Sequence, residues 1–364
     1  MRKFMTTAAA VVAASALALT GCGRQESTTN SGSGSSASAG FEKGSLIGVA
    51  LPQKTSENWV LAEKLFKDDL EAAGYKTDVQ FANNGVAEQQ NQISSMVSKG
   101  AKVIIVGAID SKQLGSQLKQ AKDAGATVIA YDRLVEDTAN VDYYLAFDNF
   151  KVGELQGQAL IDGLKKKGSA PWNIELLAGS PDDANSKRFF DGAMSKLQPE
   201  ISKGEMKVLS GQTQFNQVVT QGWKAENAQK RFDTILSGSY ASAKLDGVLS
   251  PNDTLARAVL TSVKSAGKPT PVITGQDSEV ESVKLIMKGE QYSTISKDTR
   301  ALVKQAVTMV NELQSTGKAT TNDEKSYNNG KKVVPAYLLE PVIVTKDNAA
   351  EVYKNDPTLG PITK

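Results

Sequence analysis

The chain has 364 residues, of which 40% are hydrophobic and 23% charged, so it is long enough for about two domains and can bury large cores. It contains no histidine and one cysteine, which excludes an intramolecular disulfide and Ser-His-Asp or Cys-His catalysis and argues against a transition-metal site. With 42 basic and 40 acidic residues and no basic block, its charge does not indicate nucleic acid as a partner.

The first 21 residues have the parts of a lipoprotein signal peptide. Two basic residues are followed by an apolar stretch over residues 5–19 and by the motif L-T-G-C at residues 19–22, which ends on the only cysteine. The apolar stretch is too short for a membrane span. We therefore expect cleavage before Cys22 and acylation of that residue, which holds the protein on the extracellular or periplasmic side of the cell membrane through lipid alone. An ordinary secreted protein with an incidental cysteine is the alternative.

The next segment has the composition of a tether. Residues 23–40 contain no apolar side chain larger than alanine, so they cannot bury themselves in a core. We interpret residues 22–42 as a flexible, lipid-anchored tether that precedes the folded part. Removal of residues 1–21 takes away two basic residues and no acidic one, so the remaining chain has no net charge.

From residue 46 onward, short apolar runs alternate with helical patterns. Runs about five residues long are bounded by turn-forming residues, and helical stretches of 13 or 14 residues lie between them. This alternation predicts βαβ units and a parallel sheet with helices on both faces, in which strands are continuously apolar. The expected strands are residues 46–51, 103–107, 127–131 and 143–147, and two of the expected helices are residues 86–99 and 112–124.

The second half of the chain repeats this plan. Residues 103–132 and 246–277 each contain a strand, an acidic residue, a helix that ends at Ala-Gly, a second strand and a terminal acid, which is Asp132 or Asp277. Two similar α/β lobes are the simplest interpretation, although βαβ units also resemble one another in general. Asp110 and Asp253, at the ends of the first strands, could serve only as helix N-caps, and we interpret Asp110 in this way.

Polar residues follow most of the predicted strands. Ligands of open parallel sheets bind beyond the carboxyl ends of the strands, so these residues would line one cleft if the two lobes face each other. They are the stretches 54–59 and 181–187 and the pairs 109–110, 132–133, 148–149, 252–253 and 276–277.

This polar set suits a sugar. No glycine-rich phosphate loop follows a strand. Sugar hydroxyls both donate and accept hydrogen bonds, which suits Asp, Asn and Arg side chains, and the apolar face of a sugar ring suits an aromatic side chain. Trp59 and Trp223 lie at predicted loop or helix-start positions, where they either stack on a ligand or pack against a lobe. A pair of carboxylates for glycoside hydrolysis is a further alternative.

Several stretches together resemble one family. They are VIAYDRL, VDYYLAFDNFKVGELQ, NIELLAGSPDD, VLSPND, TGQDSEVESVK, GEQYSTISKDTR and VVPAYLLEPV, between residues 46 and 344. They resemble the periplasmic sugar-binding proteins of ABC importers, of the type I ribose, xylose and galactose class, and most of all the multiple-monosaccharide-binding proteins related to xylose-binding protein. The resemblance implies an α/β fold of two doubly wound parallel-sheet lobes joined by a three-crossover hinge. It places residues 43–148 and 299–337 in the N-terminal lobe and residues 149–298 and 338–364 in the C-terminal lobe.

The resemblance also implies a set of ligand contacts. Asp132 and Arg133 would bind sugar hydroxyls from the first lobe, Trp59 and Trp223 would enclose the ring, and Asn149 would act at the hinge. The remaining contacts would be Asn58, Asn185, Lys187, Asn252, Asp277 and Lys297.

One position departs from the pattern of the family. Relatives tend to have arginine where this chain has Asn58, which is shorter and uncharged. We therefore expect a shift in sugar preference, toward a ketose such as fructose.

We predict a lipid-anchored solute-binding protein that captures a monosaccharide, either an aldose or a ketose and including fructose or a pentose, and delivers it to the permease subunits of an ABC importer. It is expected to be a monomer without cofactor or metal and not an enzyme. The alternative is a sensor that presents its sugar-bound form to a receptor or kinase. A DNA-binding regulator of the same plan would need a helix-turn-helix where the signal peptide and tether stand, and an enzyme would need further acid or base groups.

Overall fold

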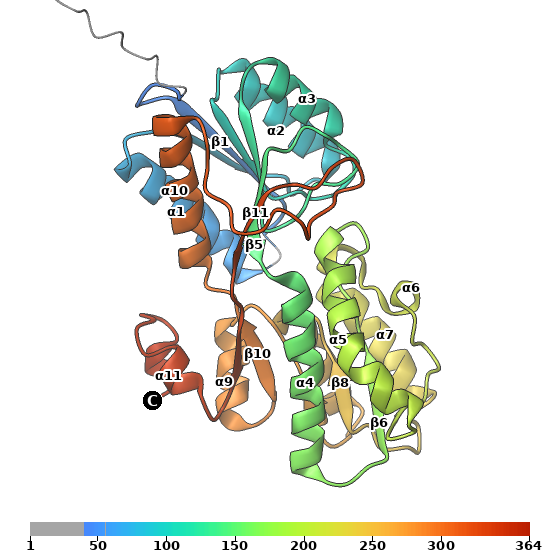
Figure 1. The fold of residues 1–364 in the computed structure, drawn as a ribbon. Helices are drawn as coiled ribbons and strands as arrows, with labels where there is room; N and C mark the ends of the chain where they lie inside the picture. The colour runs from blue at the N-terminus through green and yellow to red at the C-terminus, as the bar shows by residue number, and fades with distance from the viewer. Residues whose placement is uncertain (1–39, 55) are drawn as a thin grey trace, which may run out of the picture. The chain divides into compact units, whose positions relative to one another are not determined.

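The computed structural model describes residues 40–54 and 56–364 (Figure 1). The predicted signal peptide, Cys22 and the predicted tether up to residue 39 lie outside these residues. Within the described part of the chain, no helix is both long and apolar enough to cross a membrane.

Strands and helices alternate along most of this part. The strands are β1 (Leu46–Leu51), β2 (Lys76–Phe81), β3 (Val103–Val106), β4 (Thr127–Tyr131), β5 (Tyr143–Phe147), β6 (Trp172–Leu176), β7 (Met206–Val208), β8 (Gly247–Leu249), β9 (Val272–Ile273), β10 (Ser293–Ser296), β11 (Ala336–Leu339) and β12 (Val342–Thr345). The α-helices are α1 (Glu57–Ala72), α2 (Val86–Ser98), α3 (Gly115–Asp123), α4 (Asn149–Lys167), α5 (Ala184–Ser202), α6 (Phe215–Val218), α7 (Ala225–Ser237), α8 (Asp253–Ser265), α9 (Val280–Lys288), α10 (Thr299–Thr316) and α11 (Ala349–Val352). Two short 3-10 turns are η1 (Gln221–Trp223) and η2 (Gly360–Ile362).

The first lobe is built on a six-stranded parallel sheet in the order β11-β5-β4-β3-β1-β2. One face packs against α1 and α10 through residues such as Phe66 and Val303, and the other face packs against α2 and α3 through residues such as Ile93 and Leu118. Because helices cover both faces, strands such as β3 (VIIV) are buried along their whole length, which explains their continuously apolar sequence.

The second lobe is built on a four-stranded parallel sheet in the order β7-β6-β8-β9. Helices α7 and α8 cover one face, with Phe232 and Val259 in the core, and α4 and α5 cover the other, with Leu160 and Phe190. The antiparallel pair β10 and β12 belongs to neither large sheet and was not predicted from the sequence.

The chain passes between the lobes at three places. These are the connections from β5 to α4, from β10 to α10 and from β11 to β12 (Figure 1). The predicted fold class, two doubly wound lobes with a three-crossover hinge, agrees with this arrangement. Strand β11 runs to Leu339, so its last two residues lie beyond the predicted end of the first lobe at residue 337.

The expected strands at residues 46–51, 127–131 and 143–147 are confirmed, whereas α3 starts three residues later than expected. The carboxylate of Asp110 accepts hydrogen bonds from the backbone N of Lys112 and from Nε2 of Gln113, at 2.8 and 2.7 Å. These contacts form a turn ahead of the helix, and the N-cap position is occupied by Leu114. The interpretation of Asp110 as a helix N-cap was therefore wrong.

Candidate functional site

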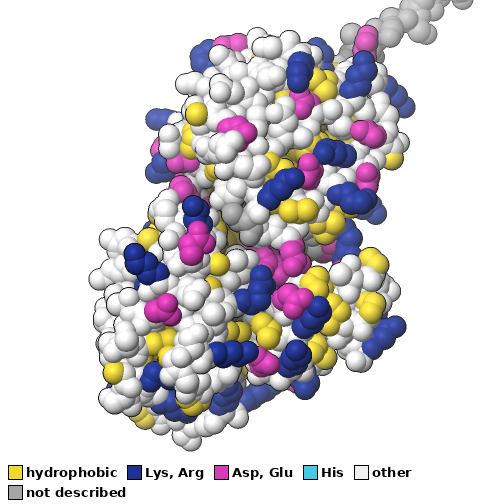
Figure 2. Space-filling view, turned by 180° about the vertical axis from the view of Figure 1, so that it is seen from behind, with side chains coloured by type: hydrophobic (Ala, Val, Ile, Leu, Met, Phe, Trp, Pro, Cys, Tyr) yellow, Lys and Arg dark blue, Asp and Glu magenta, His cyan; other side chains and the backbone are white. Residues whose placement is uncertain are grey.

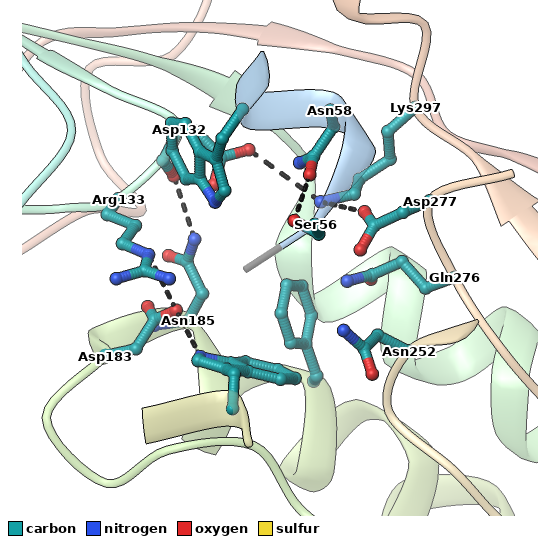
Figure 3. Close-up of a pocket in the computed structure, with 13 residues that line it drawn as sticks. Ser56, Asn58, Asp132, Arg133, Asp183, Asn185, Asn252, Gln276, Asp277 and Lys297 are labelled. Atoms are coloured by element: carbon teal, nitrogen blue, oxygen red, sulfur yellow. Dashed lines mark hydrogen bonds and ion pairs between the residues drawn. The ribbon is translucent and has the colours of Figure 1, made fainter. Parts of the chain in front are cut away.

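A pocket lies between the two lobes (Figure 3). Its lining comes from segments that follow β1, β4, β6, β7, β8, β9 and β10. Most of these are parallel strands, whose carboxyl ends are the usual place for a ligand in such sheets. The lining residues are Ser56, Asn58, Trp59, Asp132, Arg133, Asp183, Asn185, Phe189, Trp223, Asn252, Gln276, Asp277 and Lys297. Nine of the ten ligand contacts predicted from the sequence are among them.

Two of the lining residues follow β4 directly. The backbone N of Arg133 donates to the carbonyl of Tyr131 at 2.6 Å, so the chain turns sharply at Asp132, whose φ is 60°. The turn ends the buried strand at the edge of the sheet, and both charged side chains reach the pocket. Aspartate is one of the few residues other than glycine that adopt this left-handed backbone with some ease.

Arg133 connects the lobes through Asp183. Its Nε lies 3.0 Å from Oδ2 of Asp183, the N-cap of α5, and the same oxygen accepts from Nε1 of Trp223 at 3.1 Å. The Arg133 guanidinium also donates to the carbonyl of Ala108 and lies 5.4 Å from the centre of the Trp59 ring. Burial raises the pKa of Asp183, and the charge of Arg133 opposes that rise.

Lys297 lies between two carboxylates, one from each lobe (Figure 3). Its Nζ is 3.2 Å from Oδ1 of Asp277 and 3.7 Å from Oδ2 of Asp132, and its side chain is only 7% exposed. Burial acts to lower the pKa of Lys297, but attraction to Asp277 and Asp132 outweighs it and raises the pKa. Burial likewise raises the pKa of Asp277, against the opposing effect of Lys297.

Two amide side chains of the second lobe also face the pocket. Asn252 is the N-cap of α8, and its Oδ1 accepts from the backbone N of Leu255 at 3.0 Å, which leaves its NH₂ group for a ligand. Gln276 is 2% exposed, and its Oε1 has no hydrogen-bond partner within the described part of the chain. A buried acceptor of this kind normally has a partner, so it marks a position for a ligand donor.

Asn185 and Asn149 form a polar contact between the lobes beside the hinge. The Asn185 Nδ2 donates to the backbone carbonyl of Asp132 at 2.8 Å, and the Tyr144 hydroxyl donates to the same carbonyl at 2.6 Å. Asn149, the first residue of α4, donates from Nδ2 to Oδ1 of Asn185 and to the Tyr144 hydroxyl, at 3.0 and 2.9 Å. Asn149, the predicted hinge residue, is therefore connected to the backbone carbonyl of Asp132 through the side chains of Asn185 and Tyr144.

Each lobe packs a tryptophan over a glycine that follows one of its strands. A Cβ at Gly107 would lie 3.0 Å from the Trp59 ring, and a Cβ at Gly179 would lie 2.1 Å from the Trp223 ring. The second approach admits no side chain other than hydrogen. Phe189 adds a third aromatic ring to the lining, and Lys297 Nζ lies 5.6 Å from its centre.

Lys187 does not join the other predicted contacts. It is absent from the pocket lining, its side chain is 62% exposed, and its Nζ pairs with Asp191 at 2.6 Å. Asn185 and Phe189 are four positions apart on α5 and face the pocket together, so position 187 between them points away. The structure therefore places Lys187 outside the pocket, and its predicted ligand contact has no support from this geometry.

Sequence reasoning did not single out four of the lining residues: Ser56, Asp183, Phe189 and Gln276. Three of them lie within the polar stretches after the predicted strands, where nothing distinguished them from their neighbours. Phe189 could have been found from its helical spacing to Asn185.

Comparisons with known proteins agree with this geometry. Residues 47–319 match the family model described as a periplasmic binding protein domain. The chain belongs to the periplasmic binding protein family. As a periplasmic binding protein it functions outside the cytoplasm, which confirms the predicted location apart from the lipid anchor.

On the face shown in Figure 2, basic and acidic side chains are interspersed.

Relatives of this periplasmic binding protein include sugar-binding proteins. It is 48% identical over 312 residues to the multiple sugar-binding periplasmic receptor ChvE of Rhizobium radiobacter, covering 84% of this chain and 88% of the relative. It is 34% identical to the D-xylose-binding periplasmic protein of Escherichia coli, covering 85% and 89% of the two chains. A solved ABC transporter solute-binding protein from Clostridium phytofermentans with bound β-D-glucose superimposes with a TM-score of 0.83 at 39% identity, covering 88% of this chain and all of that one. These relatives are binding proteins, which confirms the predicted family and fold and the expectation that the chain is not an enzyme.

Proposed function

We propose that this protein captures a monosaccharide in the pocket between its lobes and delivers it to the permease of an ABC importer. The observation that carries the proposal is the pocket itself. It combines charged and amide groups from both lobes with three aromatic rings. A small ligand rich in hydroxyl groups is the chemistry that uses all of these groups together.

Each class of lining group has a role in this proposal. Asp132 and Asp277 accept from hydroxyl groups, while Arg133, Lys297 and Asn252 donate to hydroxyl oxygens. The ion pairs of Lys297 keep the side chains of Asp132 and Asp277 in place before the ligand arrives. This lowers the entropic cost of ordering these side chains on binding. Aromatic rings contact the C–H faces of the sugar ring.

Contacts from both lobes would couple sugar binding to the closed arrangement. At the edge of the pocket, Nε2 of Gln53 donates to the carbonyl of Gly222 at 3.3 Å, and the backbone N of Val280 donates to the Glu57 carboxylate at 3.1 Å. A sugar held by both lobes has higher affinity for the closed form than for an open one, and this difference shifts the population toward closure. The closed form is then the one that a permease receives.

The sugar is proposed to be bound as a pyranose. This is supported by the bound β-D-glucose of the Clostridium phytofermentans protein. Asn58 accepts a hydrogen bond from the Ser56 hydroxyl, so its NH₂ group is the part left for a ligand. The shift toward fructose that Asn58 led us to expect stays a prediction.

Lipid attachment at Cys22 is the second part of the proposal. It is supported by the signal-peptide pattern of residues 1–22. Expression in a bacterium supplied with a clickable fatty acid tests it. We expect label on the wild-type protein, and we expect Cys22→Ser to be unlabelled; label that persists in the variant would refute attachment at this residue.

A thermal-shift panel tests sugar binding. Processed protein is heated with D-glucose, D-galactose, D-xylose, L-arabinose or D-fructose. Ligand at 100 times its dissociation constant adds about 2.7 kcal/mol to the unfolding free energy, which is a clear rise in Tm. Aldoses are expected to shift Tm; a larger shift with fructose would support the prediction from Asn58, and no shift with any sugar would count against the function.

A further inference from the structure

The loop that carries Asp277 has an unusual backbone. Gln276 and Asp277 line the pocket, and residues 277 and 278 both have positive φ, 94° for Asp277 and 57° for Ser278. L-residues rarely adopt this conformation, and two in succession persist only where the surrounding structure holds them. The position of the Asp277 carboxylate therefore depends on what holds the loop.

Asp253 holds the loop at both ends. Its backbone N donates to the carbonyl of Gln276 at 3.0 Å, and its Oδ2 accepts from the backbone N of Glu279 at 2.9 Å. The two strained residues lie between these contacts. Asp253 itself is 0% exposed and is not part of the pocket lining.

Thr294 connects the same carboxylate to the middle of the loop. Its hydroxyl donates to Oδ2 of Asp253 at 2.9 Å and accepts from the backbone N of Ser278 at 3.1 Å. The other carboxylate oxygen, Oδ1, accepts from Nε2 of Gln291 at 2.8 Å. The hydrogen bonds from Glu279, Thr294 and Gln291 use the carboxylate oxygens of Asp253 as acceptors, and an asparagine would replace one of the two oxygens by a donor.

Capping of α8 does not account for Asp253. The N-cap is Asn252, whose side chain accepts from Leu255 N, and Asp253 is the first residue of the helix. The contacts of its carboxylate described above include no basic side chain, because Lys297 pairs with Asp277 and Arg257 pairs with Glu279. Burial and the neighbouring charge of Glu279 raise the pKa of Asp253 well above its usual value. A buried acid without a basic partner is costly unless it is hydrogen-bonded, and the hydrogen bonds that offset this cost come from Glu279, Thr294 and Gln291.

We propose that Asp253 is a positioning residue for sugar binding, which acts by holding residues 276–279 in the conformation that presents Asp277 to the ligand. This inference rests on the proposed function. Loss of the Asp253 carboxylate lets the loop relax to an ordinary backbone and moves Asp277 away from Lys297 and the pocket.

A double-mutant cycle tests the proposal. The dissociation constant of the sugar that gives the largest thermal shift is measured by calorimetry for wild type, Asp253→Asn, Asp277→Asn and the double variant. We expect Asp253→Asn to weaken binding at least tenfold, and the double variant to bind no more than about twofold more weakly than Asp277→Asn alone, because Asp253 acts through Asp277. Binding by Asp253→Asn within twofold of wild type would overturn the proposal, as would losses that multiply fully in the double variant.

Matched variants separate positioning from general stability. Asp246→Asn removes a carboxylate of the same lobe that accepts from the backbone N of Asn173, on another part of the sheet, and should lower stability without changing affinity. Thr294→Val should repeat the loss of affinity in a milder form, and Thr294→Ser should restore it, which keeps the test available if Asp253→Asn fails to fold. Equal affinities for the valine and serine variants would also overturn the proposal. If the wild-type protein binds no monosaccharide, the proposed function itself is wrong. If Asp277→Asn loses affinity and Asp253→Asn does not, sugar binding stands and only the positioning role of Asp253 is wrong.

Discussion

Trp59 and Trp223 reach the same pocket from different lobes and are held there in different ways. Trp59 lies on the regular helix α1, and its ring packs edge-on against Tyr131, with 6.1 Å between the ring centres. Trp223 ends the 3-10 turn η1 with a φ of 55°, and its Nε1 donates to Asp183, which in turn pairs with Arg133 of the other lobe. Both rings are thus packed in the core of their lobe, and Trp223 adds a polar contact to Asp183, which in turn reaches across the pocket to Arg133.

The same contrast extends to the charged groups. The first lobe presents Asp132 and Arg133 from a single turn after one strand, whereas the second lobe presents its polar residues from several separate loops. The site residues of the second lobe therefore depend more than those of the first lobe on contacts among loops. They also depend on contacts with the other lobe. Four measurements test this difference.

The largest effect is expected at Asp132, because it faces both the ligand and Lys297. Asp132→Asn keeps a residue that tolerates positive φ but removes the charge. Removing one partner of a buried charged pair costs about 2–5 kcal/mol, so affinity should fall by ~30-fold or more. Calorimetry measures the affinity, and circular dichroism should show an unchanged fold. Affinity close to that of wild type would remove Asp132 from the site.

The two tryptophans should respond unequally to phenylalanine. Trp223→Phe leaves the Asp183 carboxylate without one of its hydrogen-bond donors. We expect this to weaken the free energy of sugar binding by about 1–3 kcal/mol. Trp59→Phe keeps an aromatic ring against Tyr131, and we expect a smaller loss, of about 0.5–1.5 kcal/mol. Sugar titrations of both variants give the comparison directly. Equal losses, or a larger loss at Trp59, would contradict the difference between the lobes.

Asp277 should make both stability and binding depend on pH, in opposite directions. Burial raises its pKa in the folded protein above the unfolded value of about 3.9, so its contribution to stability is fully present below that value and is lost as pH rises through the folded pKa. Sugar binding needs the carboxylate and should weaken as pH falls through the same pKa. Urea unfolding and calorimetry of wild type and Asp277→Asn between about pH 4 and 8 measure the two slopes. Identical slopes in the two proteins would rule out Asp277 as their source.

The smallest effect is expected at Lys187. Its side chain is exposed and pairs with Asp191 on the same helix, and exposed pairs of this kind contribute little. Lys187→Ala should change sugar affinity by less than about twofold. A tenfold loss would instead restore the role that the family resemblance implied and would show that α5 turns when sugar binds.

The sequence predicted more of the strands and helices of the first lobe than of the second, for a physical reason. In the first lobe, the buried run TVIAY ends at Asp132, so an apolar pattern with a charged end was enough to place two site residues. In the second lobe, strands β8 and β9 have only three and two residues, and the site residues lie on loops fixed by tertiary contacts. The role of Asp183 depends on Arg133, which is far away in the sequence, and no local pattern reveals it.

The antiparallel pair β10 and β12 shows the same limit. The two strands are separated by α10 and β11, which belong to the other lobe, so neither run has a partner nearby in the sequence. Alternation of strands and helices predicts βαβ units, but it carries no information about a pairing that crosses the hinge twice.

The most direct test of the account is a fluorescence titration with only the pocket tryptophans present. The chain has three tryptophans, and Trp172 lies on β6 outside the pocket lining, so Trp172→Phe leaves Trp59 and Trp223 as reporters. We expect a saturable change in emission when a monosaccharide is added, and no such change when Asp132→Asn is introduced into the same background. No change with any sugar of the panel, or a change that persists in the Asp132→Asn protein, would contradict sugar binding in this pocket.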